Sequence, residues 1–183
     1  MIYPDSTLAH QLHLLCENEN ITLEMLAEVL GKQPEAAQMI SSNDGKSSLH
    51  SLSANVSVTL EMIEVYLYLK HGPEVAKMAD KDGKTPLHIL CGNISVTLEM
   101  VELYLKHGPG AAEVVGVNVW EVTDSAFVWT PLHYLCSNEH VTLEMIEAVI
   151  EEFPFAARAS DHRNGVKTPV RLRLNPTPEI DPP

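Results

Sequence analysis

The stretch at residues 85–100, TPLHILCGNISVTLEM, occurs in related form at three other places in the chain. Residues 10–25 read HQLHLLCENENITLEM, residues 47–62 read SSLHSLSANVSVTLEM, and residues 130–145 read TPLHYLCSNEHVTLEM. In every copy a histidine precedes the Thr of TLEM by nine positions, and the distance from one histidine to the next varies. The four histidines are His13, His50, His88 and His133. A constant spacing within blocks and a variable spacing between them predicts repeated supersecondary units joined by loops.

Each block predicts a pair of helices, and the copy at residues 82–109 shows why. Thr85 suits the N-cap of a short helix, and Pro86 suits its first position, where the missing N–H has no helical partner to lose. We expect this helix to end near Cys91 and to be closed by Gly92 and Asn93, which tolerate the left-handed conformation.

The second helix of the pair is expected to start after Thr97 as N-cap and to end before Gly108. An amphipathic stripe is predicted by apolar residues at spacings of three and four, namely Leu98, Val101, Leu105 and Met100 or Tyr104. Neither helix can bury its apolar face alone, so the units must stack.

The order of turn, TPLH, short helix, loop and LEMVELYLKHG resembles the ankyrin repeat. The resemblance covers residues from about 7 to 170 and is strongest at 85–109 and 130–157, although the loop between the helices is about two residues longer than in the common 33-residue repeat. It implies an all-α fold, an ankyrin-like α-solenoid of stacked helix-loop-helix repeats. It also implies that the histidine of TPLH serves the turn by bonding backbone groups there. The motif residues are Thr85, Pro86, Leu87, His88, Thr130, Pro131, Leu132, His133, His50 and His13.

The blocks divide the chain into one repeat domain over residues 1–174 and a tail. We expect repeats at about 7–43, 44–81, 82–126 and 127–167, a degenerate fifth unit at 168–174, and a disordered tail at 175–183. The fifth unit could cap the apolar end of the fourth repeat. Alternatively, the chain is a fragment of a longer repeat array, and the apolar surface at that end is left exposed.

Repeat 3 carries about nine extra residues, and the segment 113–129 reads EVVGVNVWEVTDSAFVW. Two apolar runs around a polar turn predict an extended, β-hairpin-like finger before repeat 4. Trp120, Phe127 and Val119 are candidate partner contacts, whereas Trp129 could instead anchor the base of the finger. The alternative is a tolerated loop whose Trp129 packs on its neighbours. Three turn lysines are further candidate contacts: Lys46, Lys81 and Lys84.

Three histidines precede a cysteine by three positions, at Cys16, Cys91 and Cys136. Such a pair offers two metal ligands, but structural zinc needs four, and neighbouring repeats are about 10 Å apart. Ser53 takes the place of the cysteine in repeat 2 and could not replace a thiolate. We therefore expect both residue types to be structural, with no metal and no cofactor. The chain has no GxSxG, HExxH or CxxC pattern, so we expect no enzyme activity.

The chain has 183 residues with 25 Asp and Glu against 12 Lys and Arg, a formal net charge of −13. This argues against nucleic acid and anionic membranes as partners, because both attract clustered Lys and Arg. No apolar run approaches the roughly 20 residues of a membrane span, and the first residues, MIYPDSTLAH, do not read as a secretory signal. We expect a cytoplasmic protein, monomeric unless it belongs to a longer array.

The leading hypothesis is a non-catalytic interaction module, an ankyrin-repeat adaptor or scaffold that binds an unidentified protein through its concave face and fingers. The glutamates of TLEM, together with the glutamates found three positions after them in repeats 2 to 4, would form an acidic stripe along the stack. This stripe could be a solvated face or a docking surface for a basic segment. Two alternatives remain: a regulatory or inhibitory subunit of an enzyme, and the ankyrin portion of a larger enzyme or channel.

Overall fold

The computed structural model describes residues 8–108, 110–113, 116–118 and 127–158, and this part of the chain is mostly helical. Each repeat contributes a first helix and a second helix. The first helices are α1 (Leu8–Glu17), α3 (Ser48–Ala54), α6 (Pro86–Gly92) and α8 (Pro131–Ser137). The second helices are α2 (Leu23–Lys32), α4 (Leu60–Leu67), α7 (Leu98–His107) and α9 (Leu143–Glu152). No helix among the described residues has the length and apolarity to cross a membrane.

A short helical turn follows the second helix in repeats 1, 2 and 4, at the sequences PEAA (34–37), PEVA (73–76) and PFAA (154–157). These turns are η1 (Pro34–Gln38), α5 (Gly72–Lys77) and η2 (Pro154–Arg158). The two small residues of each motif contribute buried or part-buried side chains, which lets the chain turn back toward the next repeat against the core.

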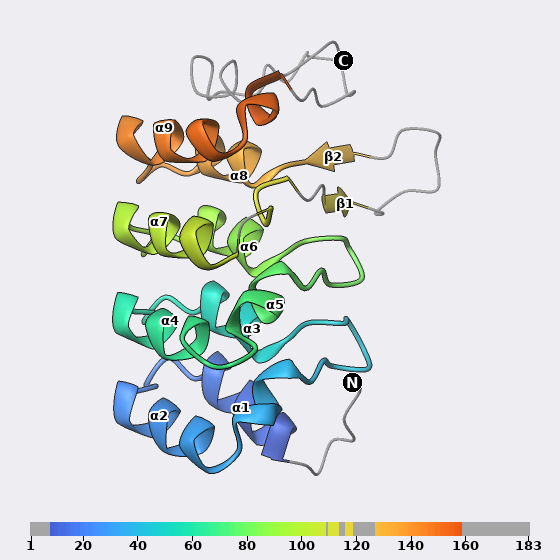
Figure 1. Cartoon of the computed structure of the whole chain (residues 1–183), viewed down its shortest axis with the longest axis vertical. Helices are drawn as coiled ribbons and strands as arrows, with labels where there is room; N and C mark the ends of the chain where they lie inside the picture. Colours follow the sequence, from blue (N-terminus) through green and yellow to red (C-terminus); the bar gives the residue numbers. More distant parts are fainter. Residues whose placement is uncertain (1–7, 109, 114–115, 119–126, 159–183) are drawn as a thin grey trace, which may run out of the picture.

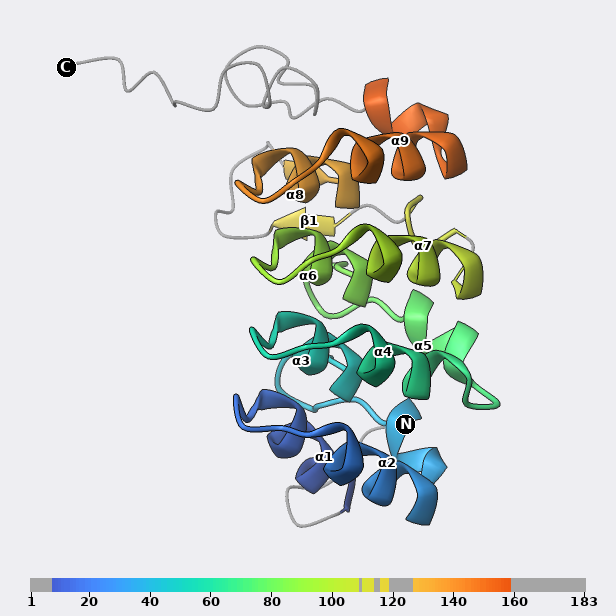
Figure 2. The same ribbon diagram turned by 90° about the vertical axis from the view of Figure 1, so that its left-hand side faces the viewer.

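The helix pairs lie one above another in sequence order, so that the molecule is an elongated stack (Figure 1). The first helices contact one another in the order α1, α3, α6, α8, and the second helices in the order α2, α4, α7, α9. Seen from the side, the first and second helices form two parallel columns, with loops and turns at their edges (Figure 2). The core runs through all four repeats between these columns.

Threonine side chains start the second helices as the sequence predicts. The hydroxyl of Thr97 accepts the N–H of Met100 at 3.4 Å, and Thr22, Thr59 and Thr142 do the same in their repeats. An N-cap of this kind satisfies one of the backbone donors that have no partner within the helix.

The predicted left-handed end of the first helix is wrong. Gly92 is the last residue of α6, and Asn93, the C-cap, has φ −78° and ψ 139°, which is an extended conformation. The Asn93 side chain is buried and bonds to the preceding repeat, and this tertiary role takes the place of a local helix-closing motif. In the predicted stripe of α7, Val101, Leu105, Met100 and Tyr104 are buried, whereas Leu98 is only partly buried.

Two short strands precede the fourth repeat, β1 (Gly116–Asn118) and β2 (Phe127–Trp129). They pair antiparallel, with Gly116 opposite Trp129 and Asn118 opposite Phe127. The residues between the strands lie outside the described residues, so a projecting finger stays a prediction. The predicted fifth unit at 168–174 and tail at 175–183 also lie outside them.

Candidate interaction surface

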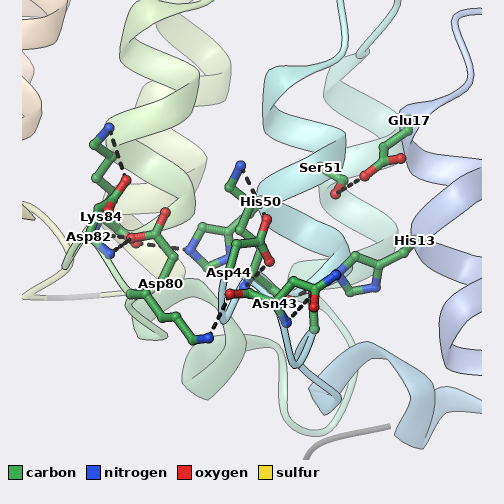
Figure 3. Close-up of polar contacts among 12 residues, drawn as sticks. His13, Glu17, Asn43, Asp44, His50, Ser51, Asp80, Asp82 and Lys84 are labelled. Atoms are coloured by element: carbon green, nitrogen blue, oxygen red, sulfur yellow. Dashed lines mark hydrogen bonds and ion pairs between the residues drawn. The ribbon is translucent and has the colours of Figure 1, made fainter. Parts of the chain in front are cut away.

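In repeats 2 and 3 the TPLH-type histidine closes the first turn of its own helix and also reaches the next repeat. In repeat 2 the Ser47 N–H donates to Nδ1 of His50 at 3.0 Å, and Nε2 of His50 donates to the Lys84 carbonyl oxygen at 2.9 Å. Because a backbone N–H can only donate and a carbonyl can only accept, these two bonds require the neutral ring with its proton on Nε2. Figure 3 shows His50 between the two turns.

The same link recurs along the stack. Nε2 of His13 lies 2.9 Å from the Lys46 carbonyl oxygen, and Nε2 of His88 lies 3.2 Å from that of Trp129. In repeats 3 and 4, His88 and His133 form capping boxes with Thr85 and Thr130, and Pro86 and Pro131 occupy the first helical positions. Leu87 and Leu132 are fully buried beside them. The motif residues thus lie in helix starts and in junctions between repeats.

Burial affects the charge of His50. Removal from water is the largest effect on this ring and lowers its pKa, because the charged form loses its hydration. The bond to Lys84 and the nearby Asp80 act in the opposite direction and do not overcome it. The ring is therefore held neutral, as its hydrogen bonds require.

A row of asparagines forms a second set of links that the sequence reasoning missed. The side-chain amide of Asn93 donates to the carbonyl oxygens of Ser53 and Asn55 at 2.9 and 2.8 Å, and Asn138 donates in the same way to those of Cys91 and Asn93. Asn55 likewise joins repeat 2 to repeat 1. These asparagines precede the Thr of TLEM by four positions in every block, and this regular recurrence was the available signal.

The cysteines lie in the core. Cys16, Cys91 and Cys136 are buried thiols that form no disulfide, and loss of hydration raises the pKa of Cys16 to about 12 and raises that of Cys91 as well. Sγ of Cys16 lies 3.2 Å from the Tyr66 hydroxyl, and in the next repeat Oγ of Ser53 lies 2.6 Å from the Tyr104 hydroxyl. Thiols held in this neutral form are poor nucleophiles and poor metal ligands.

The turns before α3 and α6 lie side by side and carry the three candidate lysines (Figure 3). The Lys81 ammonium donates to the carbonyl oxygens of Ser42 and Asn43 at 2.9 and 2.6 Å, which ties the two turns together. Lys46 lies 3.5 Å from Asp44, and Lys84 lies 3.7 Å from Asp82. The Lys84 side chain is mostly covered and its ammonium is 5.7 Å from the centre of the Tyr134 ring. All three lysines thus make contacts within the chain.

A shallow, open hollow of about 260 Å³ lies against the first helices of repeats 1 to 3. Its lining combines acidic residues from repeat 1, a lysine from the turn, and both polar and apolar residues from repeats 2 and 3. These residues are Glu17, Glu19, Lys46, His50, Ser51, Ala54, Asn55, Val56 and Ile89. Oγ of Ser51 donates to Glu17 at 3.3 Å, so one wall of the hollow is held by a hydrogen bond between α1 and α3.

Exposed apolar side chains occur in the lining of this hollow and on neighbouring parts of the same helices and loops. Val56 is 47% exposed and Ile94 is 61% exposed, and their loops are joined because Oγ of Ser95 donates to the Val56 carbonyl oxygen at 2.6 Å. Leu14, at the position of α1 that corresponds to Ser51 and Ile89, is 53% exposed. The face formed by the first helices and the loops between paired helices, which we call the groove face, is therefore partly apolar and acidic at the repeat 1 end.

The glutamates of TLEM are fully exposed on the second helices. The pKa of Glu24, Glu61, Glu99 and Glu144 is lowered, first by a hydrogen bond from the residue's own backbone N–H and then by one from the preceding threonine. These carboxylates also face the positive end of the helix dipole. Their recurrence is thus accounted for by helix initiation.

The residues predicted on the finger are only partly described. The Trp129 ring stacks on His133 at a centroid distance of 5.9 Å and meets Tyr134 edge-on at 5.2 Å, so it lies against α8. Val119 and Trp120 lie outside the described residues. The backbone of Phe127 lies opposite that of Asn118 in the β1–β2 ladder.

The described residues contain no group of three or more His, Cys, Asp or Glu side chains that could hold a metal ion. Comparison of the chain with protein-family models and with curated protein sequences finds no match in either.

Proposed function

We propose that this chain is a non-catalytic ankyrin-repeat protein, an adaptor or scaffold that holds a segment of another protein along the groove face. The observation that supports this most directly is the exposure of Val56 in the open hollow and of Ile94 on the loop bonded to it. Apolar side chains left in water beside a concavity are typical of surfaces that bind a protein partner.

The charges of the groove face suggest the chemistry of that segment. Glu17 and Glu19 line the hollow at the repeat 1 end, and Val56 and Ile89 add apolar side chains to its lining. A segment that places an apolar side chain against Val56 and a lysine or arginine near Glu17 and Glu19 would match both properties. The proposal therefore assigns the basic part of the partner to the hollow and leaves the glutamates of the second helices as a solvated surface.

Selection from a displayed random-peptide library on the immobilised 183-residue chain tests this proposal. We expect enriched peptides to combine apolar residues with Lys or Arg, and their affinity to fall at least about tenfold with Glu17→Lys/Glu19→Lys, since close charge pairs steer and stabilise association. The matched control is Glu99→Lys/Glu102→Lys, which makes the same charge change on exposed positions of α7.

Two results would contradict the proposal. No enrichment of peptides above a blank surface would remove the groove face as a binding site. A loss of affinity in the α7 variant, with none in the hollow variant, would show that the acidic stripe of the second helices is the docking surface.

A further inference from the structure

The burial of equivalent residues shows that each repeat has two different apolar sides. A repeat in the middle of the stack has one side covered by the preceding repeat and the other by the following repeat. Among the described residues, repeats 1 and 4 have such a neighbour on one side only, while their residues at equivalent positions keep the same chemistry. A comparison of their exposed fractions therefore shows whether a given position packs against the preceding or the following repeat.

The side of repeat 1 that is equivalent to the one facing a preceding repeat is more exposed than in repeats 2 to 4. Met62, Met100 and Met145 are each 4% exposed, whereas the equivalent Met25 is 49% exposed. Leu15 is partly exposed although its counterparts Leu52, Leu90 and Leu135 are fully buried. Val29 is likewise less buried than Tyr66 and Tyr104. Leu15, Met25 and Val29 form what we call the N-end face.

The side of repeat 4 that is equivalent to the one facing a following repeat is more exposed than in repeats 1 to 3. Leu143 is 64% exposed, whereas Leu23, Leu60 and Leu98 are partly buried. Ile146 is partly exposed although Leu26, Ile63 and Val101 are fully buried, and Ile150 differs in the same way from Leu30 and Leu67. Leu143, Ile146 and Ile150 stand at intervals of three and four on α9 and form what we call the C-end face.

These two faces are the two halves of a junction that the molecule already makes three times. The second helices contact one another in the order α2, α4, α7, α9, so the C-end side of each repeat meets the N-end side of the next. The N-end and C-end faces therefore fit each other in chemistry and register, whereas neither has a precedent for packing on a copy of itself.

We propose that this chain associates head to tail, with the C-end face of one copy on the N-end face of the next, so that the stack continues across molecules. The contact is heterologous, because two different patches meet, and a heterologous contact that does not close into a ring extends into an open assembly. This inference is independent of the proposed function, because it uses the ends of the stack and not the groove face.

Charge opposes this association in a measurable way. The chain has a net charge of −13, and head-to-tail stacking brings Glu144 of one copy toward Glu24 of the next, as Glu61 and Glu99 already succeed one another along the stack. Repulsion between exposed carboxylates is screened by salt, while apolar burial is not weakened. Association should therefore strengthen as the ionic strength rises, opposite to the behaviour of a basic partner on an acidic surface.

Sedimentation velocity and light scattering on the 183-residue chain test the proposal. The average mass should rise above the monomer value of 20.2 kDa with protein concentration. It should rise further between about 0.01 M and about 1 M NaCl, a range over which the screening length falls from about 30 Å to about 3 Å. Ile94→Glu, which places the same charge on an exposed apolar residue of the groove face, is the matched control and should associate like the parent chain.

Two end-face variants decide how the copies meet. Met25→Glu and Leu143→Glu each block one face at an exposed position, so each alone should remain monomeric and keep the parent's circular dichroism spectrum. Mixed together, they should form a dimer of twice the monomer mass and no larger species, because each supplies the face that the other lacks.

Other results would overturn the proposal. If the parent chain stays monomeric at every concentration and salt level, the end faces are covered by something other than a second copy. If one variant alone still dimerises, the contact joins two identical faces and is not head to tail.

Discussion

Repeats 2 and 3 and the two end repeats have the same sequence pattern but differ in how they are held. The middle repeats bond on both sides through histidine and asparagine side chains, and their second-helix tyrosines reach the preceding repeat. Repeat 1 has no preceding repeat among the described residues, and its Met25 and Leu15 are partly in water. The same residue type thus contributes differently to the stability of the fold according to its place in the stack, because each repeat contacts only its neighbours.

The largest difference is expected from leucines at equivalent positions of α6 and α1. Leu90→Ala empties a fully buried site and should lower the free energy of unfolding by about 2–5 kcal/mol. Leu15→Ala removes the same atoms from a partly exposed site and should cost clearly less. Urea-induced unfolding followed by circular dichroism measures both. Equal losses would show that repeat 1 is covered in solution as the middle repeats are.

Asparagines provide a second matched pair with an intermediate effect. Asn93→Ala leaves the carbonyl oxygens of Ser53 and Asn55 and the N–H of Ser95 without their side-chain partner, and should cost about 1–3 kcal/mol. Asn18, at the same position of repeat 1, is exposed, and its side-chain oxygen accepts a local bond from the Asn20 N–H. Asn18→Ala should therefore stay within about 0.5 kcal/mol of the parent chain. The same unfolding assay distinguishes the two, and similar losses would reduce the asparagine row to local turn bonds.

The smallest effect is a pH dependence at the junction between repeats 2 and 3. Because burial holds the pKa of His50 below its ordinary value of 6.5, the unfolded chain binds a proton more readily than the folded chain. Stability should be fully present above about pH 6.5 and should decrease as the pH falls below this value toward the lowered pKa.

Protonation of His50 destabilises the folded chain because Nδ1, which accepts the Ser47 N–H, would then carry a proton of its own and could no longer accept this bond. Unfolding curves at a series of pH values, for the parent chain and for His50→Gln, measure the effect. The parent should lose more stability than the variant over this range, and identical pH profiles would show that His50 does not titrate on unfolding.

Local structure could be predicted from the sequence because its causes lie within a few residues. Thr97 caps the helix that follows it, and Thr85, Pro86 and His88 form the start of another, all through contacts at most four positions apart. The helical fold class and the stacking of units followed from the repeated blocks, since neither helix of a pair could bury its apolar face alone. The local rule failed at Asn93, where a distant bond replaced a helix-closing conformation.

The function of these residues in the assembly was decided by tertiary structure. His50 bonds 34 residues away, Asn93 bonds 40 and 38 residues away, and Ser53 meets Tyr104 across 51 residues. Spacing along the chain does not specify such pairs, because they depend on how one repeat is rotated and shifted on the next. The same holds for the hollow beside Val56 and for the exposure of Met25 and Leu143, since a side chain's burial is set by the neighbour that covers it. The sequence therefore determined the unit, and only the packing of one unit on another decided which surfaces remain open for binding.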